Sequence, residues 1–324
     1  MYFMRGILLP LVLALLLSYL LRPIVRAFAR LHIPPALGAA VVVLGMVAVI
    51  SYAISALTAP AVSWLEKAPY SIQTIQSKLL PLRQPMQNVA KASGEIEKLA
   101  TADNSPARVV EVKQHPITDM LYIRGPGLIV SAVLLLILLY FLLAYDSVFL
   151  TKMIKVLPTL TDKKRAVHIA NEIEEHVSRY LLTATLINIG LGVAVGTTAG
   201  FLGLRNPFMW GVMVALLNFV PYLGALTGII CMTLGAIMSF DSVGYALIFP
   251  AMYLVFAMLE GNLITPVVMG RSLTLNPVMV LLSLTFWGWM WGVPGVILAV
   301  PILAAFKIFC AHIKSIEPIA EFLS

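Results

Sequence analysis

Long apolar runs separated by short polar stretches form the main pattern of this chain. Runs of about the 20 residues that a helix needs to cross a membrane lie at residues 3–21, 36–59, 128–145, 182–204 and 243–259. The run at residues 129–144 does not alternate between polar and apolar positions, as a strand of a membrane β-barrel would. In hydrocarbon, only helices and closed barrels satisfy their own backbone groups. The pattern therefore predicts an all-α polytopic membrane protein with about seven to eight transmembrane segments.

Two further apolar stretches are each interrupted by proline and glycine. The first consists of residues 208–220 and 223–240, and the second of residues 278–292 and 294–309. Both follow the same pair, Asn206-Pro207 in the first and Asn276-Pro277 in the second. At about 1.5 Å per residue, each arm is near or below the length needed to cross a core of roughly 30 Å. We therefore predict two Pro/Gly-broken helical hairpins.

The two broken hairpins suggest a binding site. Paired short segments that are broken at corresponding positions point to the site of a transporter, because broken helices expose backbone groups that only cavity water or a ligand can satisfy. The charge pattern places the start of the first hairpin outside the cell and the start of the second inside. The hypothesis is an inverted repeat. The alternative is two ordinary kinked helices or hairpins that share the Asn-Pro pair by chance.

Polar and charged stretches divide the chain into three parts. Residues 1–59 are predicted to form an N-terminal transmembrane hairpin, residues 60–125 a small soluble helical domain, and residues 126–324 the main transmembrane domain, with a cytoplasmic amphipathic segment at residues 147–181. Basic residues are concentrated in residues 22–35 and 147–181, which the positive-inside rule places in the cytoplasm. Residues 60–125 are then predicted to lie on the extracytoplasmic side.

Composition supports a membrane protein and excludes several classes of function. Of the 324 residues, 60% are hydrophobic and 11% are charged, against about 45–50% and about 25% in soluble domains. The net charge is +7, and the charged residues lie between apolar spans, so they indicate membrane topology rather than nucleic-acid binding. The two cysteines are too few for a disulfide framework or a thiolate metal site. Arginines follow the apolar run at residues 7–21, so a retained transmembrane helix is predicted rather than a signal peptide.

Polar residues inside apolar spans are costly, so each is a candidate for a substrate or ion pathway. Glu260 ends the span at residues 243–259, either as a carboxylate that couples transport to an ion or as the partner of Arg271 at the interface. Asn188 and Asn218 either line a pathway or join helices by hydrogen bonds. The predicted pathway residues are Glu260, Asn262, Asn218, Pro221, Gly224, Asn188, Arg271, Pro294 and Gly295.

No motif for a metal, a cofactor or an enzymatic reaction stands out. His168, Glu172 and His176 are spaced by four on one helical face, which is a spacing that can bind a metal. Because Lys164 and Arg179 alternate with them, a solvated face with salt bridges is predicted there, and no metal site. The chain has neither a Gly-x-x-x-x-Gly-Lys-Ser/Thr loop nor a Gly-x-Gly-x-x-Gly turn after a strand. We therefore expect no ATP-driven mechanism, no cofactor and no enzymatic activity.

Three stretches together resemble the signature of the autoinducer-2 exporter family of bacterial permeases. They are residues 260–277 (EGNLITPVVMGRSLTLNP), 218–224 (NFVPYLG) and 286–301 (FWGWMWGVPGVILAVP). The order of elements is similar along nearly the whole chain. The resemblance implies a multi-pass protein of the bacterial inner membrane that exports a small polar solute, such as autoinducer-2, without ATP and forms homo-oligomers. Family members usually have one more transmembrane helix ahead of this chain's first, so features that depend on it are not predicted here.

Two alternatives to the exporter stay open. Some members of the family resemble Na⁺(Li⁺)/H⁺ antiporters, for which Glu260 and Asp146 would be the titrating groups and Na⁺ or H⁺ the transported ions. The other alternative is a non-transporting scaffold whose residues 60–125 bind a partner. All three place the chain in a lipid bilayer and none involves nucleic acid.

Overall fold

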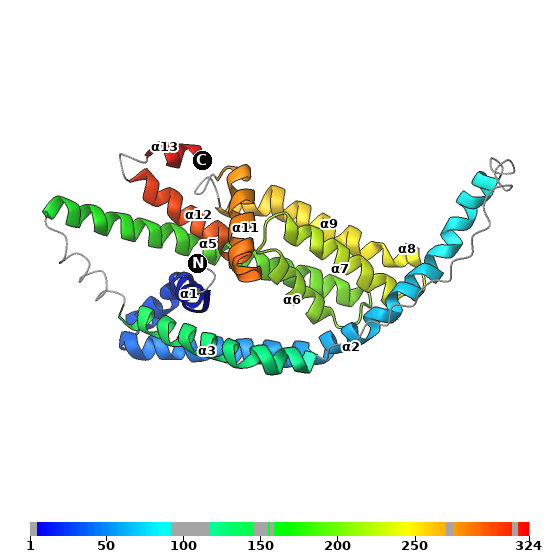
Figure 1. The fold of residues 1–324 in the computed structure, drawn as a ribbon, viewed down its shortest axis with the longest axis horizontal. Coiled ribbons are helices and arrows are strands. Elements are labelled where there is room, and N and C mark those ends of the chain that lie inside the picture. Colours follow the sequence, from blue (N-terminus) through cyan, green and yellow to red (C-terminus); the bar gives the residue numbers. More distant parts are fainter. Residues whose placement is uncertain are drawn as a thin grey trace.

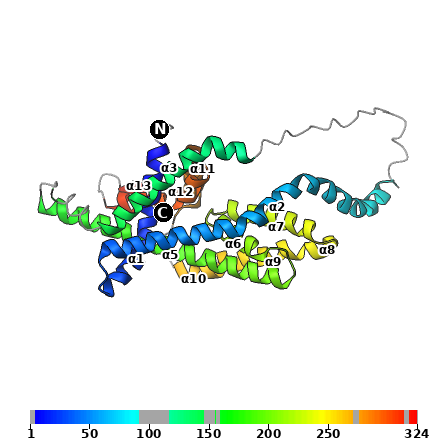
Figure 2. The same ribbon diagram turned by 90° about the horizontal axis from the view of Figure 1, so that it is seen from below.

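The protein is a bundle of helices, several of them much longer than one membrane crossing (Figures 1 and 2). The computed structural model describes residues 5–91, 117–145, 155, 159–269, 275–312 and 317–323. All regular elements in these ranges are helices, which confirms the all-α fold. Within the described residues, six helical stretches are long and apolar enough to cross a membrane: Gly6–Arg30, Pro35–Trp64, Gly127–Ala144, Lys163–Phe201, Val243–Val268 and Val293–Ala311. The exact number of spans stays a prediction.

The first two helices run past their predicted ends at residues 21 and 59. Helix α1 is Arg5–Arg30 and α2 is Pro35–Lys91. The arginines expected in a connector lie on the last turns of α1, because arginine favours a helix and a change in polarity does not end one. The turn lies at His32, whose φ is 65°, and Pro35 opens α2, where its missing N–H costs nothing.

Helix α2 also leads into the predicted soluble domain. Its residues 60–91 are helical, and α3, Ile117–Ala144, begins before residue 125. Trp64 packs edge-on against Trp210, with ring centroids 5.0 Å apart, so this part of α2 contacts the rest of the bundle. Residues 92–116 lie outside the described part of the chain. The extracytoplasmic position of residues 60–125, like the division into three domains, stays a prediction.

Helix α5, Leu160–Phe201, is a single helix of 42 residues. The predicted amphipathic segment, which ends at residue 181, continues without a break into the apolar run that begins at residue 182, and its cytoplasmic position stays a prediction. The apolar side of this half of α5 packs inside the protein, because Val177 is buried against Leu16 of α1 and Leu298 of α12 (Val293–Ala311). Helix α5 contacts α1, α12, α6 (Pro207–Leu217) and α9 (Ile248–Leu259), and it runs through the middle of the molecule in Figure 1.

The remaining helices include the two predicted broken hairpins. The first consists of α6, Pro207–Leu217, and α7, Leu223–Ser239; the second consists of α11, Pro277–Trp291, and α12, Val293–Ala311. Three of these four arms, α6, α7 and α11, are shorter than 18 residues, as the broken-helix prediction requires.

Between the hairpins, the signature stretch at residues 260–277 is helical in its first half. Helix α9, Ile248–Leu259, is preceded by the short α8, Val243–Ala246. It continues into a π-helical turn, η2 (Glu260–Ile264), and then α10, Thr265–Met269. The chain ends in α13, Glu317–Phe322, which packs against α12.

Close packing of α5 against α6 depends on glycines. Gly192 of α5 and Gly211 of α6 face each other, and a Cβ added at Gly192 would lie 2.6 Å from the carbonyl oxygen of Gly211. Small residues allow two membrane helices to approach until their backbones touch, which is where much of their packing energy arises. This contact fixes the first hairpin on α5.

Candidate functional site

The two hairpins are built in the same way. In each, the sixteenth residue after the opening asparagine has a positive φ and directly precedes the second helix. These residues are Tyr222, with φ 63°, and Gly292, with φ 69°. Glycine adopts such a backbone freely, whereas tyrosine is strained there, and strain of this kind concentrates at functional sites. The break of the first hairpin is therefore the more unusual of the two.

A glycine in the first turn of each second helix lets the hairpin close. A Cβ added at Gly224 would collide with the carbonyl oxygen of Leu217, and one added at Gly295 with that of Trp287. Leu217 is the tenth residue after Pro207, and Trp287 is the tenth residue after Pro277. A close contact between a glycine and a carbonyl oxygen thus recurs in both hairpins, with the carbonyl at the same position and the glycine shifted by one residue. The correspondence supports a repeat, while its inversion across the membrane stays a prediction.

The hairpins differ at their first residues. The Asn276 side chain accepts a hydrogen bond of 3.0 Å from the backbone N–H of Val278 and caps α11. Asn206 has φ 55° and makes no such bond with α6. The shared Asn-Pro pair therefore does not reflect a shared cap.

The breaks of both hairpins lie beside α5. Val220, in the break between α6 and α7, packs on a cluster formed mainly by α11 and α12, which Tyr180 of α5 also contacts. Trp291, at the end of α11, is buried with Leu16 of α1 and Val177 of α5. We call the place where the first break meets α5 and the second hairpin the hairpin junction; its members named here are Tyr180, Val220 and the residues of that cluster.

Two predicted polar residues meet at the first break. Asn218, the C-terminal cap of α6, donates a hydrogen bond of 2.9 Å from its side-chain nitrogen to the side-chain oxygen of Asn188 on α5. Asn188 is buried and Asn218 is half-buried. Pro221 lies in the same break and Gly224 in the first turn of α7, so four of the predicted residues come together here. The asparagines form the interhelical bond that was one of their two interpretations, and a place in a pathway stays a prediction.

Glu260 opens the π-helical turn that interrupts the helical stretch Val243–Val268. Its carboxylate accepts a hydrogen bond from the hydroxyl of Thr265. The side chain of Asn262 is exposed and donates to the carbonyl oxygen of Met258 at 3.0 Å. π-Helical turns are rare and are frequent at functional sites, so this turn keeps Glu260 among the candidates. Arg271 and Asp146 lie outside the described residues.

Tyr253 is not among the pathway residues predicted from the sequence. It is completely buried in α9, and its hydroxyl has no hydrogen-bond partner among the described residues. The ring lies against Gly228 of α7, where an added Cβ would come within 2.7 Å of the hydroxyl oxygen. Tyr253 precedes Glu260 by seven residues and so lies near the same face of the helix. A tyrosine inside an apolar run was the available signal.

Pro294 and Gly295 lie in the first turn of α12, at the second break, and are distant in sequence from Asn188 and Asn218. The predicted residues therefore form three groups: those at the first break with Asn188 and Asn218, those at the second break, and those at the π-helical turn. Helix α5 contacts α6, η2 and α12, which carry these groups.

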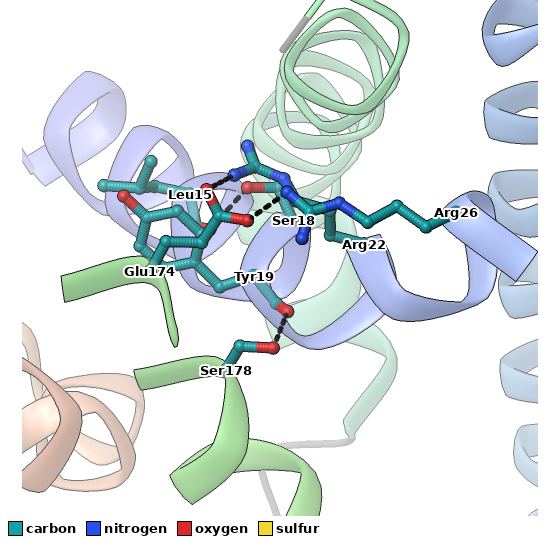
Figure 3. Close-up of polar contacts among 7 residues, drawn as sticks. All are labelled: Leu15, Ser18, Tyr19, Arg22, Arg26, Glu174 and Ser178. Carbon is teal, nitrogen blue, oxygen red and sulfur yellow. Dashed lines mark hydrogen bonds and ion pairs between the residues drawn. The ribbon is translucent and has the colours of Figure 1, made fainter. Parts of the chain in front are cut away.

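An ion-pair cluster joins α1 to α5 (Figure 3). Arg22 and Arg26 of α1 both pair with the carboxylate of Glu174, the latter at 2.6 Å. One turn further along α5, the hydroxyl of Ser178 donates to the carbonyl oxygen of Tyr19 at 2.7 Å. The side chains of Arg22 and Glu174 are only 10% and 17% exposed. Arg26 and Glu174 stand 148 positions apart in the sequence, so no local pattern could pair them.

The predicted polar face of α5 has the expected salt bridges and one unexpected member. Nη2 of Arg179 lies 2.7 Å from Oε1 of Glu175, and Nε2 of His168 lies 3.6 Å from Oε2 of Glu172. The third residue of this group is His312, which follows α12, and not His176.

The architecture described above, long apolar helices with two broken hairpins, is that of a multi-pass membrane protein. Residues 1–315 match the sequence profile described as AI-2E family transporter, so the chain belongs to that family. It is 28% identical to "AI-2 transport protein TqsA" of Escherichia coli (strain K12) over 99% of this chain and 90% of that protein. It is 26% identical to "Putative transport protein YhhT" of the same strain over 98% and 88% of the two chains. It is 25% identical to "Putative transport protein YueF" of Bacillus subtilis (strain 168) over 96% and 85%. These names fit a protein that is not an enzyme.

Proposed function

We propose that this transporter is an ATP-independent permease of the bacterial inner membrane that exports a small polar solute, with autoinducer-2 as the first candidate. The observation that carries the proposal is the hairpin junction, where two hairpins of the same construction meet beside α5. The name of the relative from Escherichia coli supplies the candidate solute. Assembly into homo-oligomers, which the family resemblance implies, is part of the same proposal.

The residues at the first break suit a small polar solute. The amides of Asn188 and Asn218 offer both donors and acceptors, and their mutual bond is one that a solute with hydroxyl groups can replace. Tyr222, strained at φ 63°, marks a backbone segment whose conformation is not its most stable one. In transporters with repeats, one repeat moves against the other around a site at their interface. The hairpin junction is such an interface.

A second candidate function is cation/proton antiport. Glu260 is the one charged residue of the helical stretch Val243–Val268, all of which is described, and it stands at the π-helical turn. A carboxylate in a membrane span is a functional candidate by default, because keeping a charge there is costly. The hydrogen bond from Thr265 shows that its side chain is held within the helix.

One assay separates the candidates. Purified protein is placed in liposomes under an imposed pH or Na⁺ gradient, and H⁺ flux, Na⁺ flux and efflux of labelled autoinducer-2 are followed. We expect efflux without ATP that does not depend on the ion gradients and that Glu260→Gln changes less than about tenfold, the effect of about 1.4 kcal/mol. Glu321→Gln, at an exposed position of α13, is the control.

Two other outcomes would contradict the exporter. Ion flux that Glu260→Gln abolishes and Glu321→Gln leaves intact would establish the antiporter. If correctly inserted protein gave neither solute efflux nor ion flux, both transport functions would be contradicted and the non-transporting scaffold would remain.

A further inference from the structure

Three side chains from distant parts of the sequence converge at the N-terminal half of α5. His168 and Glu172 are one turn apart on α5, and His312 is the C-terminal cap of α12. Nε2 of His312 lies 2.7 Å from Oε2 of Glu172, and Nε2 of His168 lies 3.6 Å from the same oxygen. All three potential ligand atoms are within 4.8 Å of one another. We propose that this His168–Glu172–His312 cluster binds one Zn²⁺ ion or a similar divalent transition metal.

The distances suit a tetrahedral ion. Two imidazole nitrogens and one carboxylate oxygen form a donor set that Zn²⁺ accepts, with the fourth position left to water. For metal–ligand bonds of about 2.0–2.1 Å, tetrahedral ligand atoms stand about 3.3 Å apart. The two distances to Glu172, 2.7 and 3.6 Å, lie on either side of that value. All three ligand atoms lie within 4.8 Å of one another, so binding requires the side chains to draw together toward the tetrahedral spacing.

A hydrogen bond made by the other ring nitrogen of His312 supports its role as a ligand. Its Nδ1 lies 2.9 Å from the carbonyl oxygen of Ile308, one turn earlier in α12. Without metal, Nε2–H donates to Glu172; a bound ion takes the place of that proton, and with the other proton kept on Nδ1 for the carbonyl, the lone pair of Nε2 faces the ion. Ligating histidines usually make such a bond with their other nitrogen, because it fixes the tautomer and the ring orientation.

The surroundings allow access and limit the affinity. The side chain of His168 is 72% exposed, so an ion reaches the cluster directly from solvent. Glu172 and His312 are partly covered, at 29% and 22% exposed, which holds them in place. Arg165 donates to the carbonyl oxygen of His312 and brings a positive charge near the site. We therefore expect micromolar rather than nanomolar binding.

A bound ion would connect α5 to the second hairpin. Helix α12 is the second arm of that hairpin, and the cluster lies at the end of α12 away from the break. Spacing in the sequence favoured His176 as the third member of the face, and the partner that the structure supplies, His312, stands 144 positions after His168. This site is independent of the proposed solute.

The test is metal binding by the full chain, purified without an affinity tag. Titration with Zn²⁺ in a calorimeter and the visible spectrum with Co²⁺ are measured for the unmodified protein and three variants. We expect one ion per chain and a tetrahedral Co²⁺ spectrum. His168→Ala and His312→Ala should weaken binding by about 10- to 100-fold. His176→Ala removes a histidine from the same helix and should leave binding unchanged.

Two outcomes would overturn the site: no saturable binding by the unmodified protein, or equal binding by His176→Ala and His168→Ala. His168→Ala keeps the test valid if His312→Ala fails to fold, because the exposed His168 contributes little to packing.

Discussion

Gly224→Ala and Gly295→Ala are each expected to destabilise the protein strongly and to remove transport. A methyl group at either position collides with a backbone carbonyl oxygen, that of Leu217 or that of Trp287. A backbone group at a helix end cannot move aside as a flexible side chain can, so the arms of the hairpin must separate. Overpacking of this kind costs about 1–3 kcal/mol and occasionally more. Thermal unfolding in detergent measures the loss.

The matched control is Gly190→Ala, within α5, where an added Cβ meets no atom within 4 Å. Alanine favours a helix over glycine by about 1 kcal/mol, so this variant should unfold at or above the temperature of the unmodified protein. If Gly224→Ala and Gly190→Ala unfold at the same temperature, the close contact in the hairpin does not exist as described.

Glu174→Gln is the second change with a large expected effect. It removes the carboxylate that pairs with both Arg22 and Arg26 and leaves the buried guanidinium of Arg22 without that charge. Breaking a buried ion pair by removing one partner costs about 3–5 kcal/mol. We expect a loss of about 3 kcal/mol, near the low end, because the Arg26 side chain is 63% exposed. Thermal unfolding should show this loss.

The neighbouring residue supplies the control. Glu175 pairs with Arg179 at 2.7 Å, but its side chain is 67% exposed. Surface pairs of this kind are worth about 0–1 kcal/mol, so Glu175→Gln should change stability little. Equal effects of Glu174→Gln and Glu175→Gln would show that the α1–α5 cluster is solvated and carries no special stability.

The broken hairpins were predictable because their signals are local. Pro207 and Pro277 open helices, and the prolines and glycines at the breaks change the backbone where they stand. Helix ends were harder to predict. A change from apolar to charged residues, as after Leu21, marks where a helix leaves the membrane, and the helix itself continues to Arg30. For the same reason α5 appeared as two segments.

The candidate site was harder to predict from the sequence, because it depends on contacts between residues that are distant in the chain. Asn188 and Asn218 were singled out separately, and only the fold shows that they bond to each other. The partners of Glu174 lie on α1, and His312, one partner of Glu172, follows α12; no spacing in the sequence identifies these pairs. Tyr253 was overlooked because its ring fits an apolar span, and only its burial shows an unbonded hydroxyl.

Thiol accessibility at the hairpin junction tests the central claim most directly, namely that the solute passes there. Val220→Cys is made in a chain with Cys231 and Cys310 replaced by alanine, with Leu216→Cys, an exposed apolar position of α6, as the control. In proteoliposomes, we predict that a charged thiol reagent labels Val220→Cys and blocks efflux of labelled autoinducer-2, and that unlabelled autoinducer-2 slows the labelling. Leu216→Cys should react slowly and keep its efflux. A cysteine at position 220 that the reagent reaches from neither side, with efflux unchanged, would contradict the claim.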